Sequence, residues 1–115
     1  MASVPEGRRL AELCRDFADE KKALHPVILD LRKVSSVADY FVICAAESEP
    51  QLKAISNGLE KTLKDEYGLR PQAVDGFPKS QWVVVDYGDV MVHIFNPATR
   101  AFYNLEALWG DAPKI

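Results

Sequence analysis

The hydrophobic pattern of the first third of the chain changes from a helical period to continuous apolar runs. Apolar residues over 10–24 recur at helical spacing with charged residues between them, which predicts an amphipathic helix that ends before His25-Pro26. Two short, continuous apolar runs follow, at 27–31 and at Tyr40–Ala45, with a polar segment between them. Such runs are typical of strands that are buried on both faces of a sheet.

A second helix has start and stop signals of its own. Ser48 can accept a hydrogen bond from the backbone amide of Gln51 while the Gln51 side chain reaches back, an arrangement called a capping box, and Pro50 fits the first turn. Gly68 is a natural stop, because glycine adopts the left-handed conformation at little cost. The interior Gly58 costs a helix about 1 kcal/mol relative to alanine, so we expect it to permit close packing on a strand. The buried stripe is expected at Leu52, Ile55, Leu59, Leu63 and Tyr67.

A β-hairpin is the clearest local signal in the second half of the chain. Apolar runs at 82–87 and Val90–Phe95 flank Gly88-Asp89, the length and residue type of a two-residue turn with glycine in its first central position. Asp86 and Asp89 are expected to face each other across this tight turn. Two-metal catalysis requires carboxylates that converge on metals ~3.5 to 4 Å apart. Hydrogen bonding within the turn is the plainer role for this pair.

The remaining elements complete a single α/β unit. A short strand over 72–75 and a turn at 76–78 precede the hairpin, and helical character resumes over 98–108. The order is therefore helix, two strands, helix, three strands and a short helix, which predicts a mixed β-sheet of about five strands flanked by helices. We assign residues 8–112 to one domain and expect residues 1–7 to be disordered.

Composition bounds the class of protein. The chain has 115 residues, of which 48% are hydrophobic and 27% charged, an ordinary composition for a domain with one hydrophobic core. It contains no apolar run of the ~18 residues that a membrane span requires, and its first residues lack the apolar segment of a secretory signal. The net charge of −3 argues against binding of free nucleic acid, which requires a basic face. We therefore expect a soluble cytoplasmic protein.

Few residues are suited to catalysis or metal binding. Cys14 and Cys44 lie in apolar runs without a histidine or second cysteine at metal-ligand spacing, so both are predicted to be reduced core residues. No glycine-rich loop enters a helix, and Glu47 and Glu49 before the second helix would repel a phosphate. His93 lies mid-strand among apolar residues, which favours a structural ring hydrogen-bonded to a neighbour or, alternatively, a place in an interface. We expect no metal and no cofactor.

Large amphipathic side chains are concentrated after position 80. Tryptophan, tyrosine and arginine dominate interface hot spots, because each buries a large area while keeping a polar group. The spacing favours core positions for Phe95, Phe102 and Trp109. Trp82 and Tyr87 stand at strand ends and fit either a core or an interface.

Three segments resemble the ribosomal silencing factor family, also called Iojap-like. They are residues 38–44, 82–95 and 100–109, which read ADYFVIC, WVVVDYGDVMVHIF and RAFYNLEALW. The resemblance extends over residues 10–112. It implies a nucleotidyltransferase-like α/β fold without the transferase's metal-binding signature. It also implies a translational repressor that binds the large ribosomal subunit through its ribosomal protein fourteen, blocks association with the small subunit, and reduces translation under nutrient limitation.

The resemblance also implies where the partner binds. Trp82 and Tyr87 would supply apolar anchors. Asp86 and Glu106 would meet basic groups of the ribosomal protein, and Arg100 would hold the local framework. The full set of residues that the resemblance implies for binding is Trp82, Asp86, Tyr87, His93, Arg100, Tyr103 and Glu106. The family's usual Gly-Thr-Ser-like segment followed by arginine is absent at 46–50, which argues against a binding role for that loop.

Two alternatives stay open beside this interpretation. A divergent nucleotidyltransferase-like enzyme would use Asp39, Asp86 and Asp89. A homodimer would form through the exposed edge of the predicted hairpin, since an unpaired strand is a template for pairing. Steric silencing requires no bond-making, so we expect a protein that is not an enzyme.

Overall fold

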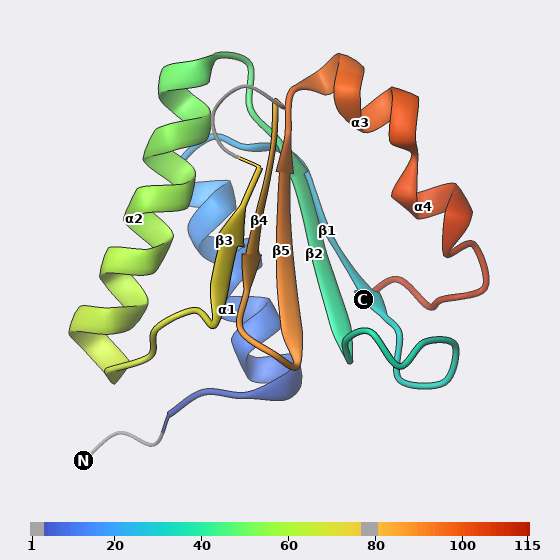
Figure 1. Cartoon of the computed structure of the whole chain (residues 1–115), viewed down its shortest axis with the longest axis horizontal. Helices are drawn as coiled ribbons and strands as arrows, with labels where there is room; N and C mark the ends of the chain where they lie inside the picture. The colour runs from blue at the N-terminus through green and yellow to red at the C-terminus, as the bar shows by residue number, and fades with distance from the viewer. Residues whose placement is uncertain (1–3, 77–80) are drawn as a thin grey trace.

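Five strands form one mixed sheet with helices on both of its faces (Figure 1). The computed structural model describes residues 4–76 and 81–115. The strand order is β1-β2-β5-β4-β3, in which β2 and β5 are parallel and all other neighbours are antiparallel. This confirms the predicted α/β class and strand number. The elements are α1 (Gly7–Glu20), β1 (Leu24–Asp30), β2 (Tyr40–Ala45), α2 (Glu49–Tyr67), β3 (Ala73–Asp75), β4 (Trp82–Asp86), β5 (Val90–Phe95), α3 (Pro97–Tyr103) and α4 (Leu105–Leu108).

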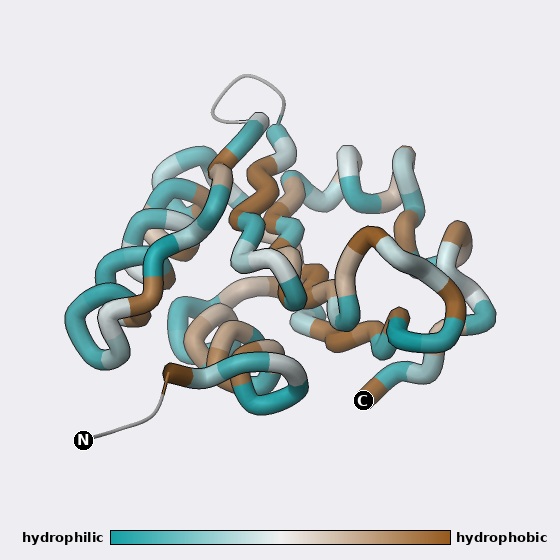
Figure 2. The backbone as a smooth tube through the Cα atoms, turned by 60° about the horizontal axis from the view of Figure 1, so that its bottom comes forward, coloured by the Kyte–Doolittle hydropathy of each residue, from teal (hydrophilic) through white to brown (hydrophobic). Residues whose placement is uncertain are grey.

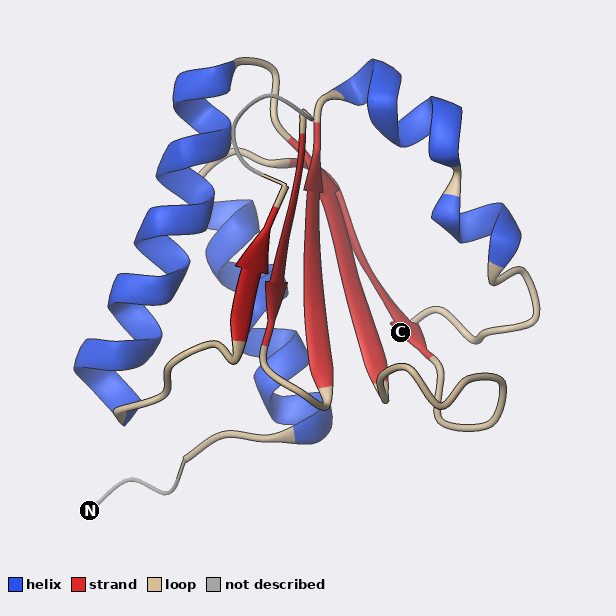
Figure 3. Ribbon diagram, in the orientation of Figure 1, coloured by secondary structure: helices blue, strands red, loops and turns tan. Residues whose placement is uncertain are grey.

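The two parallel strands lead into helices on opposite faces (Figure 3). β2 is followed by α2, which lies with α1 on one face, and β5 is followed by α3 and α4 on the other. Strand residues alternate between these faces. Val83 and Val85 of β4 are buried against α1 and α2, whereas Trp82, Val84 and Asp86 point to the side of α3, which we call the α3 face. In Figure 2 the strands are largely hydrophobic, while the outer turns of α2 are hydrophilic.

Helix α1 ends earlier than predicted. Its last residue is Glu20, because Lys22 adopts a left-handed backbone conformation (φ 67°) and the chain turns into β1. Leu24, predicted to be helical, is instead the first residue of β1. Within the part of the chain that the structure describes, the side chain of the N-cap residue Glu6 makes no capping hydrogen bond to α1. The carboxylate of Asp89, on the β4–β5 turn, accepts the amide of Gly7 instead and so caps the helix from a distant part of the chain.

We predicted disorder for residues 1–7. Residues 1–3 of this range lie outside the described residues, so the prediction is not tested there. Pro5 is buried, and Gly7 is the first residue of α1.

Helix α2 confirms most of its sequence signals. Ser48 accepts the amide of Gln51, proline occupies the first turn, and Gly68 ends the helix in the left-handed conformation. The side-chain carbonyl of Gln51 accepts a hydrogen bond from the backbone amide of Glu47, whereas in a capping box the donor would be the next residue, Ser48. The side-chain amide of Gln51 donates to the backbone carbonyls of Lys21 and Lys22, just after α1. We predicted that Gly58 permits close packing on a strand, and this is wrong. A methyl group there would lie 2.8 Å from the Phe17 ring of α1, so the close approach is between two helices.

The β4–β5 hairpin is confirmed with its two-residue turn. The Tyr87 amide donates to the Val90 carbonyl, and Gly88 has a positive φ of 94°. The exposed hairpin edge that the homodimer alternative requires is wrong, because β5 pairs with β2 and β4 pairs with β3, so neither hairpin strand is at the edge of the sheet. Dimerisation itself stays a prediction. β3 is shorter than the predicted 72–75, and part of the turn predicted at 76–78 lies outside the described residues.

The C-terminal region forms two helices instead of the single predicted one. Asn104 adopts a left-handed conformation (φ 45°), which ends α3, and its side chain accepts the Ala107 amide at the start of α4. The tail then returns to the sheet. Lys114 forms an antiparallel bridge with Leu29, so the last residues cover part of the outer edge of β1.

Candidate protein-binding surface

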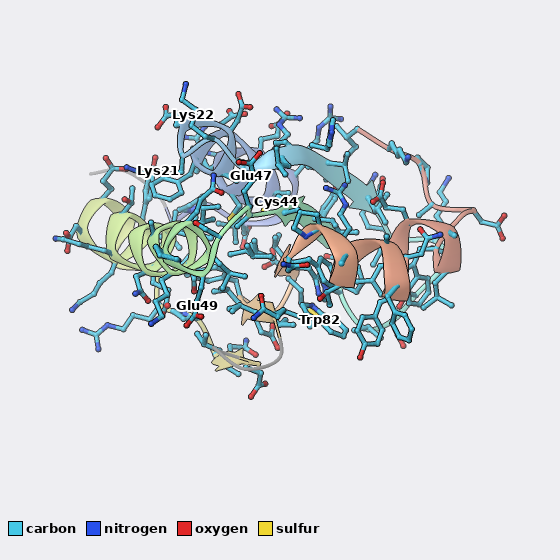
Figure 4. The ribbon with its side chains drawn as sticks, turned by 90° about the horizontal axis from the view of Figure 1, so that it is seen from above. Lys21, Lys22, Cys44, Glu47, Glu49 and Trp82 are labelled. Carbon is cyan, nitrogen blue, oxygen red and sulfur yellow. The ribbon has the colours of Figure 1, made fainter. Side chains whose placement is uncertain are left out.

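The predicted site residues divide between the two faces of the sheet. Tyr87 is only 6% exposed and belongs to the core beneath α1 and α2, where burial raises the pKa of its hydroxyl. Seen from above, Trp82 lies beside α3, on the opposite side of the sheet from α1 and α2 (Figure 4). The seven residues therefore do not form one cluster. The residues on the α3 face or on its helices are Trp82, Asp86, His93, Arg100, Tyr103 and Glu106.

Trp82 is the centre of an aromatic cluster on the α3 face. Its indole stacks on Phe95, with ring centroids 4.9 Å apart, and contacts Tyr103 at 4.8 Å. The Phe102 ring packs edge-on against Tyr103 at 5.1 Å. Exposure increases along this series: Trp82 is partly exposed, Tyr103 is 50% exposed and Phe102 is 81% exposed. The cluster thus extends from the sheet to the outer surface of α3.

His93 lies beneath Trp82 and is 4% exposed. Its Nδ1 accepts a hydrogen bond from the indole Nε1–H of Trp82 at 3.1 Å, and its ring lies 4.4 Å from that of Phe41. Burial lowers the pKa of His93 from 6.5 to about 4, because the charged form would lose its hydration. The predicted structural histidine bonded to a neighbour is confirmed.

Arg100 and Glu106 hold α3 and α4 against the start of β1. The Arg100 Nε donates to the Glu106 carboxylate at 2.9 Å. Its terminal nitrogens donate to the backbone carbonyls of Leu24 and His25 at 3.1 and 3.0 Å. Planar guanidinium groups suit such multiple bonding. This geometry matches the framework role expected for Arg100. Glu106 is engaged with Arg100, and Lys114 lies 3.7 Å from its other oxygen.

Sequence reasoning missed several exposed apolar residues of this surface. Phe102 was expected in the core and is exposed, and Leu108 on α4 is 69% exposed. Val84 and Met91 are partly exposed on the α3 face. Strand alternation was the available signal for the last two, because both share a face with Trp82.

Two of the carboxylates considered for catalysis, those of Asp86 and Asp89, serve the local structure. Asp86 accepts the Gly88 amide at 2.7 Å within the turn, and Asp89 accepts the amide of Gly7. Across the described ranges, no group of three or more histidine, cysteine or acidic side chains is arranged to hold a metal ion. Cys14 and Cys44 are buried and unbridged, as predicted, and burial raises the pKa of the Cys44 thiol to about 12. Among the helices that the structure describes, none has the length and apolarity to cross a membrane.

Comparison with known proteins gives a consistent set of relatives. Residues 4–115 match the family described as "Ribosomal silencing factor during starvation". The chain is 46% identical over 106 residues to a protein named ribosomal silencing factor RsfS from Bacillus subtilis, covering 92% of this chain and 89% of that protein. The chain is also 41% identical over 108 residues to a protein of the same name from Halalkalibacterium halodurans, covering 94% of this chain and 92% of that protein.

More distant relatives and solved structures agree. The chloroplastic protein Iojap of Zea mays is 38% identical over 98 residues, covering 85% of this chain and 42% of that protein. A crystal structure of a Chromobacterium violaceum protein superposes with a TM-score of 0.85 at 32% identity, covering 92% of this chain and 88% of that one. The same sheet and helix arrangement therefore occurs in an experimentally determined structure.

Proposed function

The chain belongs to the ribosomal silencing factor family, and we propose that it represses translation by binding the large ribosomal subunit through its ribosomal protein fourteen. The bound domain then occupies space that the small subunit requires, and translation falls when nutrients are limiting. This action needs a surface and no chemical step, so the proposal includes no catalytic residue. It places the protein with the ribosomes in the cytoplasm.

The exposed aromatic cluster on the α3 face is the observation that carries this proposal. Trp82, Tyr103 and Phe102 form a continuous series of ring contacts that ends in solvent. Partly buried aromatic residues that are held in place by packing bind partners well, because they bury a large area and lose little conformational freedom. A partner that covers this series would remove it from water, and Tyr87, buried on the opposite face, is not among the proposed contacts.

Acidic side chains on the same face of the sheet favour a basic partner. Asp75 pairs with Val84 in the sheet and so shares the α3 face, and Asp86 lies two residues further along β4. Asp75 is exposed. Carboxylates at an interface rim attract basic side chains and speed association more than they increase affinity. A basic ribosomal protein provides such side chains.

The domain is large enough for the proposed role. Its accessible surface is 6507 Å², and a specific protein contact typically buries ~800 Å² on each partner. The α3 face with α3 and α4 would therefore contribute about one eighth of the total surface, and the rest of the domain would remain as a steric obstacle to the small subunit.

Co-sedimentation with purified large and small subunits tests the proposal. We expect the wild type to sediment with the large subunit alone and to reduce the fraction of joined ribosomes. Phe102→Ala should weaken binding by about tenfold, the effect of a moderate hot spot. Since Phe102 is exposed, this change should leave the free energy of unfolding within about 0.5 kcal/mol of the wild type.

Val37→Ala is the matched control, because Val37 is also an exposed apolar residue but lies on the β1–β2 loop. It should bind as the wild type does. Equal weakening by both variants would exclude the aromatic cluster as the binding surface. A wild type that remains unbound at saturating subunit concentration would contradict the proposed function itself.

A further inference from the structure

We infer that His93 is a positioning residue for the binding surface: its imidazole fixes the orientation of the Trp82 indole, and Trp82 contacts the partner. The inference rests on the proposed function and concerns a residue that no partner can reach directly. His93 is almost fully buried, whereas Trp82 is partly exposed above it. Any effect of His93 on binding must therefore pass through a neighbour.

The geometry identifies that neighbour. In the antiparallel β4–β5 pair, Trp82 lies opposite Phe95, and His93 lies two residues away on the same face. The indole stacks on Phe95 and contacts Tyr103, and these ring contacts restrict the plane of the indole without engaging its N–H group. The 3.1 Å bond from Nε1–H to the His93 Nδ1 defines the direction in which that group points. Stacking and hydrogen bond together select one orientation of the ring.

The protonation state of His93 follows from this bond. Indole nitrogen is only a donor, so Nδ1 must be an unprotonated acceptor and the neutral ring carries its proton on Nε2. Within residues 4–76 and 81–115, no group is hydrogen-bonded to Nε2, which is buried. Phenylalanine would fill the same space and remove the unpaired Nε2, a kind of atom that proteins avoid burying, but it would also take away the acceptor of the Trp82 indole N–H. The contribution that is particular to histidine here is therefore the acceptor at Nδ1.

Two substitutions of His93 distinguish the effect of its hydrogen-bond acceptor from the effect of its aromatic ring. His93→Phe keeps an aromatic ring but removes the acceptor, and we expect it to weaken binding to the large subunit by about tenfold, the loss expected when an anchor is no longer held in place. His93→Asn places an amide oxygen near the position of Nδ1 and should bind within about threefold of the wild type. In a Trp82→Ala background, His93→Phe should have no further effect, because a residue that acts only through Trp82 has nothing left to position.

The indole resonances provide a readout that does not depend on binding. The chain contains two tryptophans, Trp82 and Trp109, and Trp82→Phe assigns their two Nε1–H signals. We expect His93→Phe to shift the Trp82 signal to the field of an unbonded indole and His93→Asn to keep it close to its wild-type position. Trp109 serves as the internal control, because its signal should change little in either variant.

The outcomes distinguish the inference from the proposed function. If the wild type binds the large subunit and a folded His93→Phe binds equally well despite a shifted Trp82 signal, the positioning role is wrong and the proposed function stands. A further loss on adding His93→Phe to Trp82→Ala, or failure of His93→Asn to bind although it keeps the indole signal, would also overturn the inference. If the wild type binds no subunit, the proposed function fails and the positioning role fails with it.

Discussion

Acidification from pH 7 to pH 5 should lower the free energy of unfolding through His93. Burial lowers the pKa of this histidine to about 4 in the folded protein, whereas the unfolded chain exposes it with its ordinary value of 6.5. Between these values the unfolded state binds a proton that the folded state does not, so stability must increase with pH. The contribution is fully present above pH 6.5 and is lost as the pH falls towards 4.

The size of the effect follows from the two pKa values. At about 1.4 kcal/mol for each pH unit, the whole window is worth about 3 kcal/mol, and the step from pH 7 to pH 5 about 2 kcal/mol. This is a large share of the 5 to 15 kcal/mol by which a domain is typically stable. Asp30 and Asp65 have lowered pKa values because of hydrogen bonds to Arg32 and Lys61, so they stay ionised in this window and contribute little.

Urea denaturation of the wild type and His93→Asn at pH 7, 6 and 5 measures this contribution. Asparagine does not titrate, so the variant should lose about 2 kcal/mol less than the wild type between pH 7 and pH 5. His25→Asn is the control, because His25 is exposed and its left-handed backbone (φ 45°) suits asparagine. It should retain the wild-type pH dependence. Parallel loss of stability in the wild type and His93→Asn would refute a buried, neutral His93.

Three further substitutions test contacts that hold the elements together. Asp89→Ala removes the acceptor of the Gly7 amide and should cost about 1 kcal/mol in urea denaturation; an unchanged midpoint would exclude Asp89 as the cap of α1. Gly58→Ala should raise the free energy of unfolding by less than the ~1 kcal/mol expected from helix propensity, because the new methyl group meets the Phe17 ring. In a Phe17→Ala background the same substitution should give the full increase, and equal increases in both backgrounds would contradict the contact. Arg100→Lys should lower the free energy of unfolding by about 1 to 3 kcal/mol and speed hydrogen exchange of the α3 and α4 amides. Unchanged exchange would show that the hydrogen bonds of Arg100 do not anchor these helices.

Hydrophobic pattern predicted the strands well and the helix ends poorly, for a physical reason. The buried strands Tyr40–Ala45 and Val90–Phe95 were predicted with the bounds that the structure has, because continuous apolar runs between polar residues define them. The end of α1 and the break between α3 and α4 depend on single residues in left-handed conformations, Lys22 and Asn104. Lysine carries no signal for such a conformation, and one asparagine within an otherwise helical pattern is a weak one.

The sequence predicts the site residues on the strands, but it does not predict where α3 and α4 place theirs. The two-residue turn fixes the register, so counting back from it sets Trp82 opposite Phe95 and His93 on the same face, while alternation sends Tyr87 to the other. The position of α3 depends on Arg100 bonding to carbonyls of β1 about 75 residues earlier in the chain, which no local pattern contains. Those bonds hold α3 and α4 over one side of the face and leave the aromatic cluster partly uncovered. Trp82 is thus packed against Phe95 and His93 as a core residue and stays partly exposed beside Tyr103, which suits the binding role that we propose for it.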